Sequence, residues 1–184
     1  MTTAFMLWRR LDAAGHDGCR LTENSDGCEL EGTAVFLHED APAHLGYYVT
    51  CDAAWRTRSG AVRGWIGPRT VDVRVERTAE GSWMLNGTAV SGLNDCVDLD
   101  LGFTPATNAL QLRRIALEKG HGADVPVAWL NDEDFSLSIL HQRYERKTAR
   151  GYWYESPRFD YAATLEVTEA GFPRLYPDLW EAES

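Results

Sequence analysis

Two aspartates in the middle of the sequence have a spacing that could support chemistry. Asp98 and Asp100 alternate with Val97, Leu99 and Leu101, which is the pattern of a strand. Both carboxylates would then lie on one face of the strand, about 7 Å apart along it. This separation could suit acid and base roles in hydrolysis of a glycosidic bond. It suits a solvent-facing strand equally well, and we expect Asp98 and Asp100 to form such a polar face.

Cationic and aromatic side chains form a second candidate group. Arg113 and Arg114 are adjacent, Arg143 precedes Tyr144, and Trp55 lies in the segment Cys-Asp-Ala-Ala-Trp-Arg-Thr-Arg. A guanidinium group can hold a phosphate or carboxylate through two hydrogen bonds. An indole can stack on a sugar ring or an acyl chain. The alternative is that the aromatic rings belong to the core and that the arginines pair with acidic residues across strands, which the many Asp and Glu residues favour.

Other kinds of site lack their sequence signatures. The five histidines have no zinc-like spacing, there is no Cys-x-x-Cys pair, and the cluster of Asp95, Asp98 and Asp100 lacks the distal Glu of a calcium loop. No nucleophile elbow or glycine-rich phosphate loop occurs. His16 and Asp17 are neighbours, but adjacent strand residues point to opposite faces. We therefore expect no metal, no cofactor and no assignable catalytic residue.

Length and charge limit the class of protein and of partner. The chain has 184 residues and a net charge of −10, which favours a single domain over residues 1–184 and disfavours nucleic acid or an anionic membrane surface as partner. The apolar N-terminal stretch is short and is followed by Arg9 and Arg10, unlike a secretory signal. No stretch is long and apolar enough for stable membrane insertion. We expect the protein to stay in the cytoplasm.

In that compartment the four cysteines are expected to be reduced thiols. Cys19 and Cys28 are the one pair for which we consider a disulfide, because a hairpin between them could bring them face to face.

Period-two alternation dominates the chain and predicts strands. The clearest segments are 28–36, 69–77, 97–101, 159–167 and a long strand that begins at Phe135 and continues through Tyr144. Asn86-Gly87 is a strong signal for a two-residue hairpin. Helix signals are sparse: Thr104 and Pro105 could begin one helical turn, whereas we favour a strand for Leu110–Leu117. Residues 172–184, which contain Pro173 and Pro177, are expected to form an irregular tail.

Several segments together resemble the bacterial putative glycolipid-binding family. The strongest runs from Leu93-Asn94-Asp95-Cys96-Val97-Asp98-Leu99-Asp100 into Thr104-Pro105-Ala106-Thr107-Asn108, followed by Arg113-Arg114. Gly15-His16-Asp17, Cys51-Asp52 with Trp55, Gln142-Arg143-Tyr144 and Tyr176-Pro177 follow the family's order, so the resemblance covers nearly the whole chain. Ala106, Ala109 and Gln111 depart from the family pattern beside the central motif.

The resemblance implies an all-β fold, in which one curved, many-stranded antiparallel sheet forms a spiral β-roll or half-barrel with little helix. It also implies an amphiphilic, glycolipid-like or lipid-like ligand in the concavity of the sheet. The candidate ligand-binding residues are Trp55, Asp98, Asp100, Arg113, Arg114, Arg143 and Tyr144.

Two alternatives stay open at this stage. An interaction or scaffold protein would have a filled interior and a large exposed apolar patch. A hydrolase, which ranks last, would use Asp98 and Asp100, with His16 as a further candidate, as acid and base.

Overall fold

The computed structural model describes residues 1–183. Most of them belong to strands, and the two helical segments are short. The elements are β1 (Thr2–Arg10), β2 (Gly15–Asn24), β3 (Gly27–His38), β4 (Ala41–Asp52), β5 (Thr57–Ile66), β6 (Arg69–Arg77), β7 (Trp83–Leu85), β8 (Thr88–Val90), β9 (Asp98–Leu101), α1 (Asn108–Ile115), β10 (Gly122–Asp124), β11 (Val127–Leu130), β12 (Leu137–Leu140), β13 (Arg143–Arg146), β14 (Gly151–Ser156), η1 (Pro157–Phe159), β15 (Tyr161–Val167), β16 (Pro173–Tyr176) and β17 (Trp180–Ala182).

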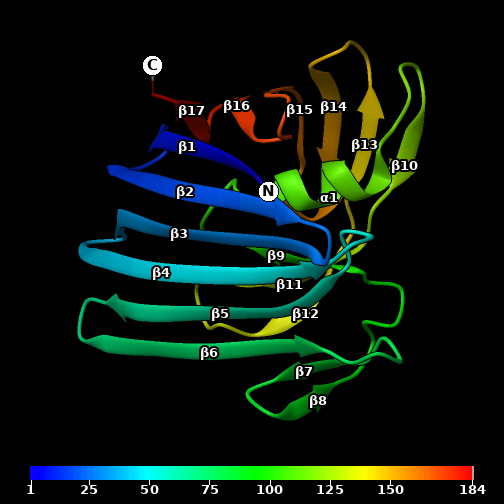
Figure 1. The fold of residues 1–184 in the computed structure, drawn as a ribbon. Helices are drawn as coiled ribbons and strands as arrows, with labels where there is room; N and C mark the ends of the chain where they lie inside the picture. Colours follow the sequence, from blue (N-terminus) through cyan, green and yellow to red (C-terminus); the bar gives the residue numbers. More distant parts are fainter. Residues whose placement is uncertain (184) are drawn as a thin grey trace.

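One large antiparallel sheet carries the architecture. Its fourteen strands follow the order β10-β13-β14-β15-β16-β17-β1-β2-β3-β4-β5-β6-β7-β8, and the sheet curves without closing into a barrel (Figure 1). The first strand, β1, pairs with the last, β17, so the two ends of the chain meet within the sheet. The predicted all-β fold with one curved, many-stranded sheet is confirmed.

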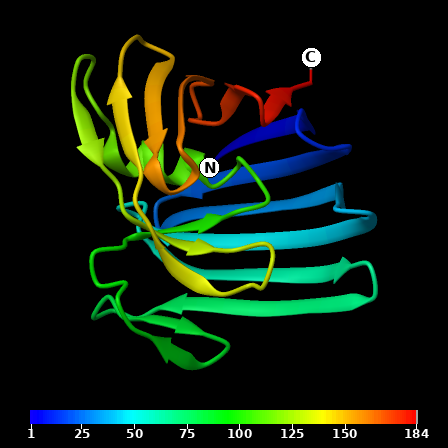
Figure 2. The same ribbon diagram turned by 180° about the vertical axis from the view of Figure 1, so that it is seen from behind.

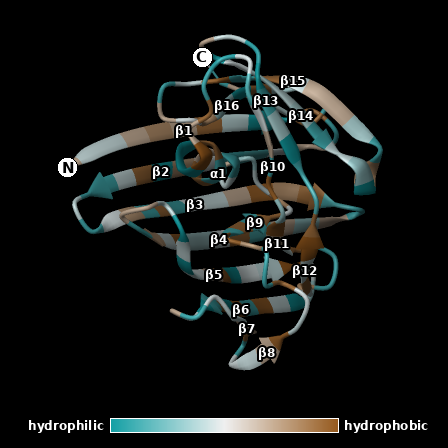
Figure 3. Ribbon diagram, turned by 90° about the vertical axis from the view of Figure 1, so that its right-hand side faces the viewer, coloured by the Kyte–Doolittle hydropathy of each residue, from teal (hydrophilic) through white to brown (hydrophobic). Residues whose placement is uncertain are grey.

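A small second sheet fills part of the space inside the curve. Its three strands have the order β12-β11-β9, with β9 parallel to β11, and they lie against β3–β6 (Figure 2). All four residues of β9 and all four of β11 are buried. Strands β11 and β12 are largely apolar (Figure 3), whereas β9 alternates Asp98 and Asp100 with Leu99 and Leu101. The concave face is therefore a packed core over much of its area, because this insert covers it.

Several local predictions are confirmed. The segment 69–77 forms β6, with Val71, Val73 and Val75 buried and the intervening residues exposed. Asn86 and Gly87 join β7 to β8, and both have the positive φ angles (50° and 80°) of a type I′ hairpin turn.

Two predictions of local structure are wrong. Residues 110–115 belong to helix α1, not to a strand, since Leu110 and Leu112 are buried there among other apolar residues. A short apolar segment cannot be assigned by its period alone. The expected strand from Phe135 through Tyr144 is two strands, β12 and β13, in different sheets. Neither helical segment in residues 1–183 has the length and apolar character needed to cross a bilayer.

The irregular C-terminal tail is also a wrong prediction over the residues described. Pro173–Tyr176 and Trp180–Ala182 form β16 and β17, because β17 finds its partner in β1, far away in the sequence. Within residues 172–184, Ser184 lies outside the described residues.

Cys19 and Cys28 do not face each other, because the register of β2 and β3 places Cys19 opposite Gly32. Cys28 instead lies opposite Cys51 on β4. All four cysteines are buried, free thiols.

Gly32 on β3 and Gly46 on β4 lie on opposite faces of the large sheet. Gly32 faces the core, where a Cβ atom would overlap the Tyr47 hydroxyl group and come within 2.8 Å of the Gly18 carbonyl oxygen. Gly46 faces outward, where the nearest heavy atom to a Cβ atom, the Arg63 carbonyl oxygen, is 3.6 Å away.

We expect Gly32→Ala to lower the free energy of unfolding by about 1–3 kcal/mol, the usual cost of overpacking a core. Gly46→Ala is the matched control and should leave it unchanged or raise it by up to about 1 kcal/mol. Urea unfolding followed by tryptophan fluorescence measures both, and equal midpoints for the two variants would contradict this packing.

Candidate functional site

Two buried aspartates of β9, Asp98 and Asp100, fix the position of the three-stranded insert through hydrogen bonds to the surrounding structure. Both carboxylate oxygens of Asp98 accept hydrogen bonds from Arg114, with Nε–Oδ1 and Nη2–Oδ2 distances of 2.8 and 2.7 Å. Asp98 is fully buried and Asp100 is 8% exposed. The expectation that they form a solvent-facing polar strand face is therefore wrong, because β9 is covered on both sides.

Asp100 is held by different partners. Thr107 donates to its Oδ1 atom and Gln142 to its Oδ2 atom, both at 2.7 Å. Burial raises the pKa of Asp100, and these two hydrogen bonds oppose the shift. Asp98 and Asp100 thus have separate partners, and this arrangement does not support paired acid–base catalysis.

A third buried carboxylate anchors the loop that leads into α1. Asp17 on β2 accepts hydrogen bonds from the hydroxyl groups of Thr104 and Tyr47, the latter at 3.0 and 3.1 Å. Thr104 in turn accepts a hydrogen bond from the Ala106 backbone N–H at 3.0 Å. Burial raises the pKa of Asp17 to about 6, although both hydroxyl groups lower it. Asp17 therefore connects the large sheet to the loop.

The space between this insert and the C-terminal strands is a cavity of about 390 Å³, which we call the aromatic cavity. It lies within the size range of about 300–1,000 Å³ that is usual for small-molecule sites. Six aromatic side chains contribute to its wall: Trp129, Tyr154, Phe159, Tyr161, Tyr176 and Trp180.

The aromatic rings support one another. Tyr154, Tyr161 and Tyr176 form a cluster with centroid distances of 5.5–6.1 Å. Across the cavity lining, Phe159 contacts Trp129 edge-on at 5.5 Å. Phe159 is 53% exposed, so it extends this apolar wall to the surface.

Polar groups also reach the aromatic cavity. Asp100, Asn108 and Ser156 line it. Ser156 is 1% exposed, and its hydroxyl oxygen has no hydrogen-bond partner among the described residues. The Gln111 Nε2 atom also lacks a partner, but Gln111 does not line the cavity. A buried hydroxyl group without a partner costs free energy, and a polar group of a ligand could supply the missing bond.

The other candidate residues from the sequence lie elsewhere. Arg113 stacks over Trp55, with 4.4 Å between the guanidinium carbon and the ring centroid, and it donates a hydrogen bond to Glu23. Arg143 is exposed and pairs with Asp124 at 3.0 Å.

Tyr144 is fully buried, where its hydroxyl group accepts a hydrogen bond from Asn108 and donates one to Gln111. Of the seven candidates, only Asp100 is among the described residues that line the aromatic cavity. Ligand binding by all seven residues stays a prediction.

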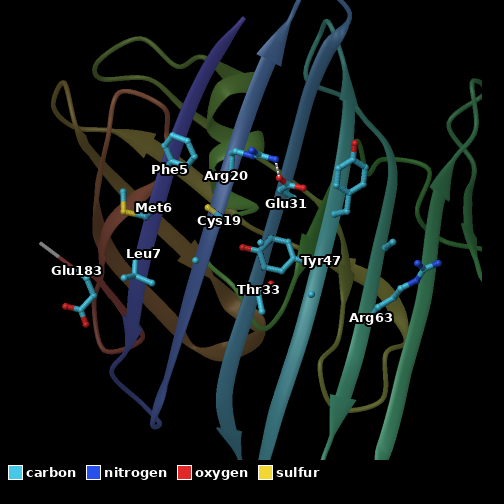
Figure 4. A pocket seen from close by; sticks show the side chains of 15 residues that line it. Phe5, Met6, Leu7, Cys19, Arg20, Glu31, Thr33, Tyr47, Arg63 and Glu183 are labelled. Carbon is cyan, nitrogen blue, oxygen red and sulfur yellow. Dashed lines mark hydrogen bonds and ion pairs between the residues drawn. The ribbon is translucent and has the colours of Figure 1, made fainter.

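A second hollow lies on the outer face of the large sheet, which points away from the insert. This outer furrow, of about 1,020 Å³, runs past Phe5 and Leu7 toward Arg63 (Figure 4). It is a shallow and open depression, and its polar side chains Arg20 and Glu31 are paired with each other. The aromatic cavity combines enclosure with an unsatisfied polar group and is therefore the better candidate site.

Comparison with known proteins identifies the family of this chain and a solved structure with the same fold. Residues 5–182 match the family model described as "Putative glycolipid-binding". The chain belongs to this family. Among curated proteins, none matches this sequence.

A solved structure shares the fold of this family member. It is a crystal structure of a DUF1089 family protein from Pseudomonas aeruginosa, with a TM-score of 0.78 and 22% sequence identity. The alignment covers 98% of this chain and 92% of the other. At this identity the likeness shows a common fold and nothing about a ligand.

The buried carboxylate of Asp17 predicts an unusual pH dependence. Burial holds its pKa at about 6 in the folded protein, above the ordinary pKa of 3.8 for an aspartate, so the folded protein binds this proton more tightly than the unfolded chain. Asp17 therefore adds stability as the pH falls from 7 to 4, by about 2 kcal/mol.

Asp17→Asn should remove this contribution. The free energy of unfolding of the variant should then rise less, or fall more, than that of the wild type as the pH falls from 7 to 4. Asp40→Asn, at an exposed turn, is the control and should keep the wild-type slope. Urea unfolding at several pH values measures the difference, and parallel curves for all three proteins would contradict the assignment.

Proposed function

We propose that this protein binds an amphiphilic, glycolipid-like molecule, with its sugar ring in the aromatic cavity. The observation that carries the proposal is the unpartnered hydroxyl group of Ser156, buried beside six aromatic side chains. Sugar rings have apolar faces and polar edges, so they fit sites in which aromatic rings and hydrogen-bonding groups converge. The description of the family agrees with this ligand class.

The geometry also indicates how the ring is held. Trp129 and Phe159 offer apolar surface on the side of the insert, and the cluster of Tyr154, Tyr161 and Tyr176 offers it on the side of the large sheet. Of the buried polar side chains Asp100, Asn108 and Ser156, the first two already have protein partners, so the Ser156 hydroxyl group is the one left for a hydroxyl group of the ligand. A cavity of this size takes one ring or a short chain, so long acyl chains stay outside it.

Ser156→Ala separates binding from folding. In the free protein the hydroxyl group makes no hydrogen bond, so its removal should leave thermal stability unchanged or slightly raised. Binding of n-octyl β-D-glucoside, measured by calorimetry below its micelle-forming concentration, should weaken roughly three- to tenfold, the loss of about one hydrogen bond.

Ser59→Ala is the matched control, because the Ser59 hydroxyl group bonds to Thr50 and lies away from the cavity. This variant should bind the glucoside as the wild type does. Equal binding by wild type and Ser156→Ala would contradict the role of Ser156, and no binding by the wild type would count against the proposed function.

The outer face supports a second candidate, which is association of two copies of this chain. Large apolar or aromatic side chains on β1, β3, β4 and β5 are 36–69% exposed there: Phe5, Leu7, Val35, Leu37, Tyr48 and Trp65. Such a concentration on one face is typical of interaction sites. The Arg20–Glu31 and Arg63–Asp72 pairs cancel local charge, so two of these faces can meet although each chain carries −10.

This second candidate predicts a mass of two chains in light scattering coupled to gel filtration. Leu7→Lys with Val35→Lys should then give the mass of one chain, because charges would enter the interface. Thr2→Lys with Thr88→Lys, at exposed positions whose strand registers place them off the outer face, is the control. A single-chain mass for the wild type at high concentration would exclude this association.

A further inference from the structure

A polar hollow adjoins the aromatic cavity and shares part of its lining. We call it the annex; its volume is about 600 Å³. Arg10, Asp12, Asp132 and Glu133 line both spaces. A ligand that fills the aromatic cavity therefore meets these four side chains where it continues outward.

The charges around the two spaces are unbalanced. Five carboxylate groups line them, against two guanidinium groups; the carboxylates are Asp12, Glu39, Asp100, Asp132 and Glu133, and the guanidinium groups are Arg10 and Arg69. The excess of carboxylates persists if Asp100, whose pKa is raised by burial, holds a proton.

Of the two arginines, Arg10 is paired with a carboxylate, whereas Arg69 lines the annex but not the aromatic cavity. Arg10 donates two hydrogen bonds to Asp12, at 2.6 and 3.0 Å, and its guanidinium group is held between the rings of Phe36 and Trp180. Arg69 donates to the Glu133 carbonyl oxygen at 2.6 Å and lies over the Phe135 ring. The charge of Arg10 is thus neutralised by Asp12, whereas Arg69 keeps its positive charge in the annex and is outnumbered there by the carboxylates of Glu39, Asp132 and Glu133.

Unlike the carboxylate of Asp12, which is paired with Arg10, the carboxylates of Asp132 and Glu133 have no cationic partner among residues 1–183. They stand where the aromatic cavity opens into the annex, as members of both linings. An anionic group on the ligand would be repelled there, whereas a hydroxyl or an ammonium group could bond to them.

We infer that the polar part of the ligand is a neutral or positively charged sugar and that the site rejects anionic head groups such as uronic acids, phosphates and sulfates. This inference rests on the proposed function. It stands on the cavity and its unpartnered Ser156 hydroxyl group as well as on the distribution of charge.

Three glycosides with the same ring and tail but different charge test the inference. They are n-octyl β-D-glucoside, the corresponding 2-amino-2-deoxyglucoside and the corresponding glucuronide, titrated into the full chain by calorimetry at low ionic strength. The neutral and ammonium compounds should bind, and the glucuronide should bind at least tenfold more weakly. Added salt should reduce this difference in affinity between the glucuronide and the other two glycosides, because it screens charges near the surface.

Asp132→Asn with Glu133→Gln should also reduce this difference in affinity, because glucuronide binding becomes stronger. The affinity for the glucoside should fall by no more than a few fold. Asp72→Asn with Glu76→Gln on β6, which line neither space, should leave this difference as in the wild type. This control has the same change in net charge.

The outcomes distinguish failure of the charge selectivity from failure of the proposed glycolipid binding. Equal binding of the three compounds, or preference for the glucuronide, would overturn the charge selectivity and leave the proposed function in place. Absence of binding by all three would overturn both. Selectivity that persists unchanged in the Asp132/Glu133 variant would show that these two carboxylates do not cause it.

Discussion

Burial of three aspartates inside a curved sheet is the constraint on which the rest of this structure depends. A carboxylate removed from water is costly unless partners satisfy it. Asp17, Asp98 and Asp100 receive theirs from different elements: Thr104 and Tyr47 for the first, Arg114 for the second, Thr107 and Gln142 for the third. The small sheet and α1 therefore fit inside the large sheet in one position. The aromatic cavity is the space that this position leaves.

The sequence predicted the architecture better than the site. Alternation identified β6, and Asn86-Gly87 identified a hairpin, because both signals are local. The burial of Asp98 and Asp100 could not be read in this way, since a strand covered on both faces can carry the same alternation as one that faces water on one side. Arg114, sixteen residues away, is what makes the burial of Asp98 tolerable.

The residues that line the aromatic cavity had no local pattern to reveal them. Trp129 lies on β11, Ser156 ends β14 and Tyr176 ends β16, and only the register of two sheets brings them together. Alternation does place Tyr161 on the same face of β15 as Leu165, but it does not say that a cavity lies beyond. The family motif was a better guide, because its Thr104-Pro105 and Asn108 line the cavity directly.

The pairing of β1 with β17 has a consequence for how this protein matures during synthesis. Strands β1–β8 can pair with sequence neighbours as they emerge, whereas β17 must find β1, from which it is separated in the sequence by the other strands. Contacts between such distant segments form slowly. Tyr161, Tyr176 and Trp180 arrive with these late strands, so the wall of the aromatic cavity is completed only after they pair, and the unfinished concave surface of a nascent chain stays exposed until then.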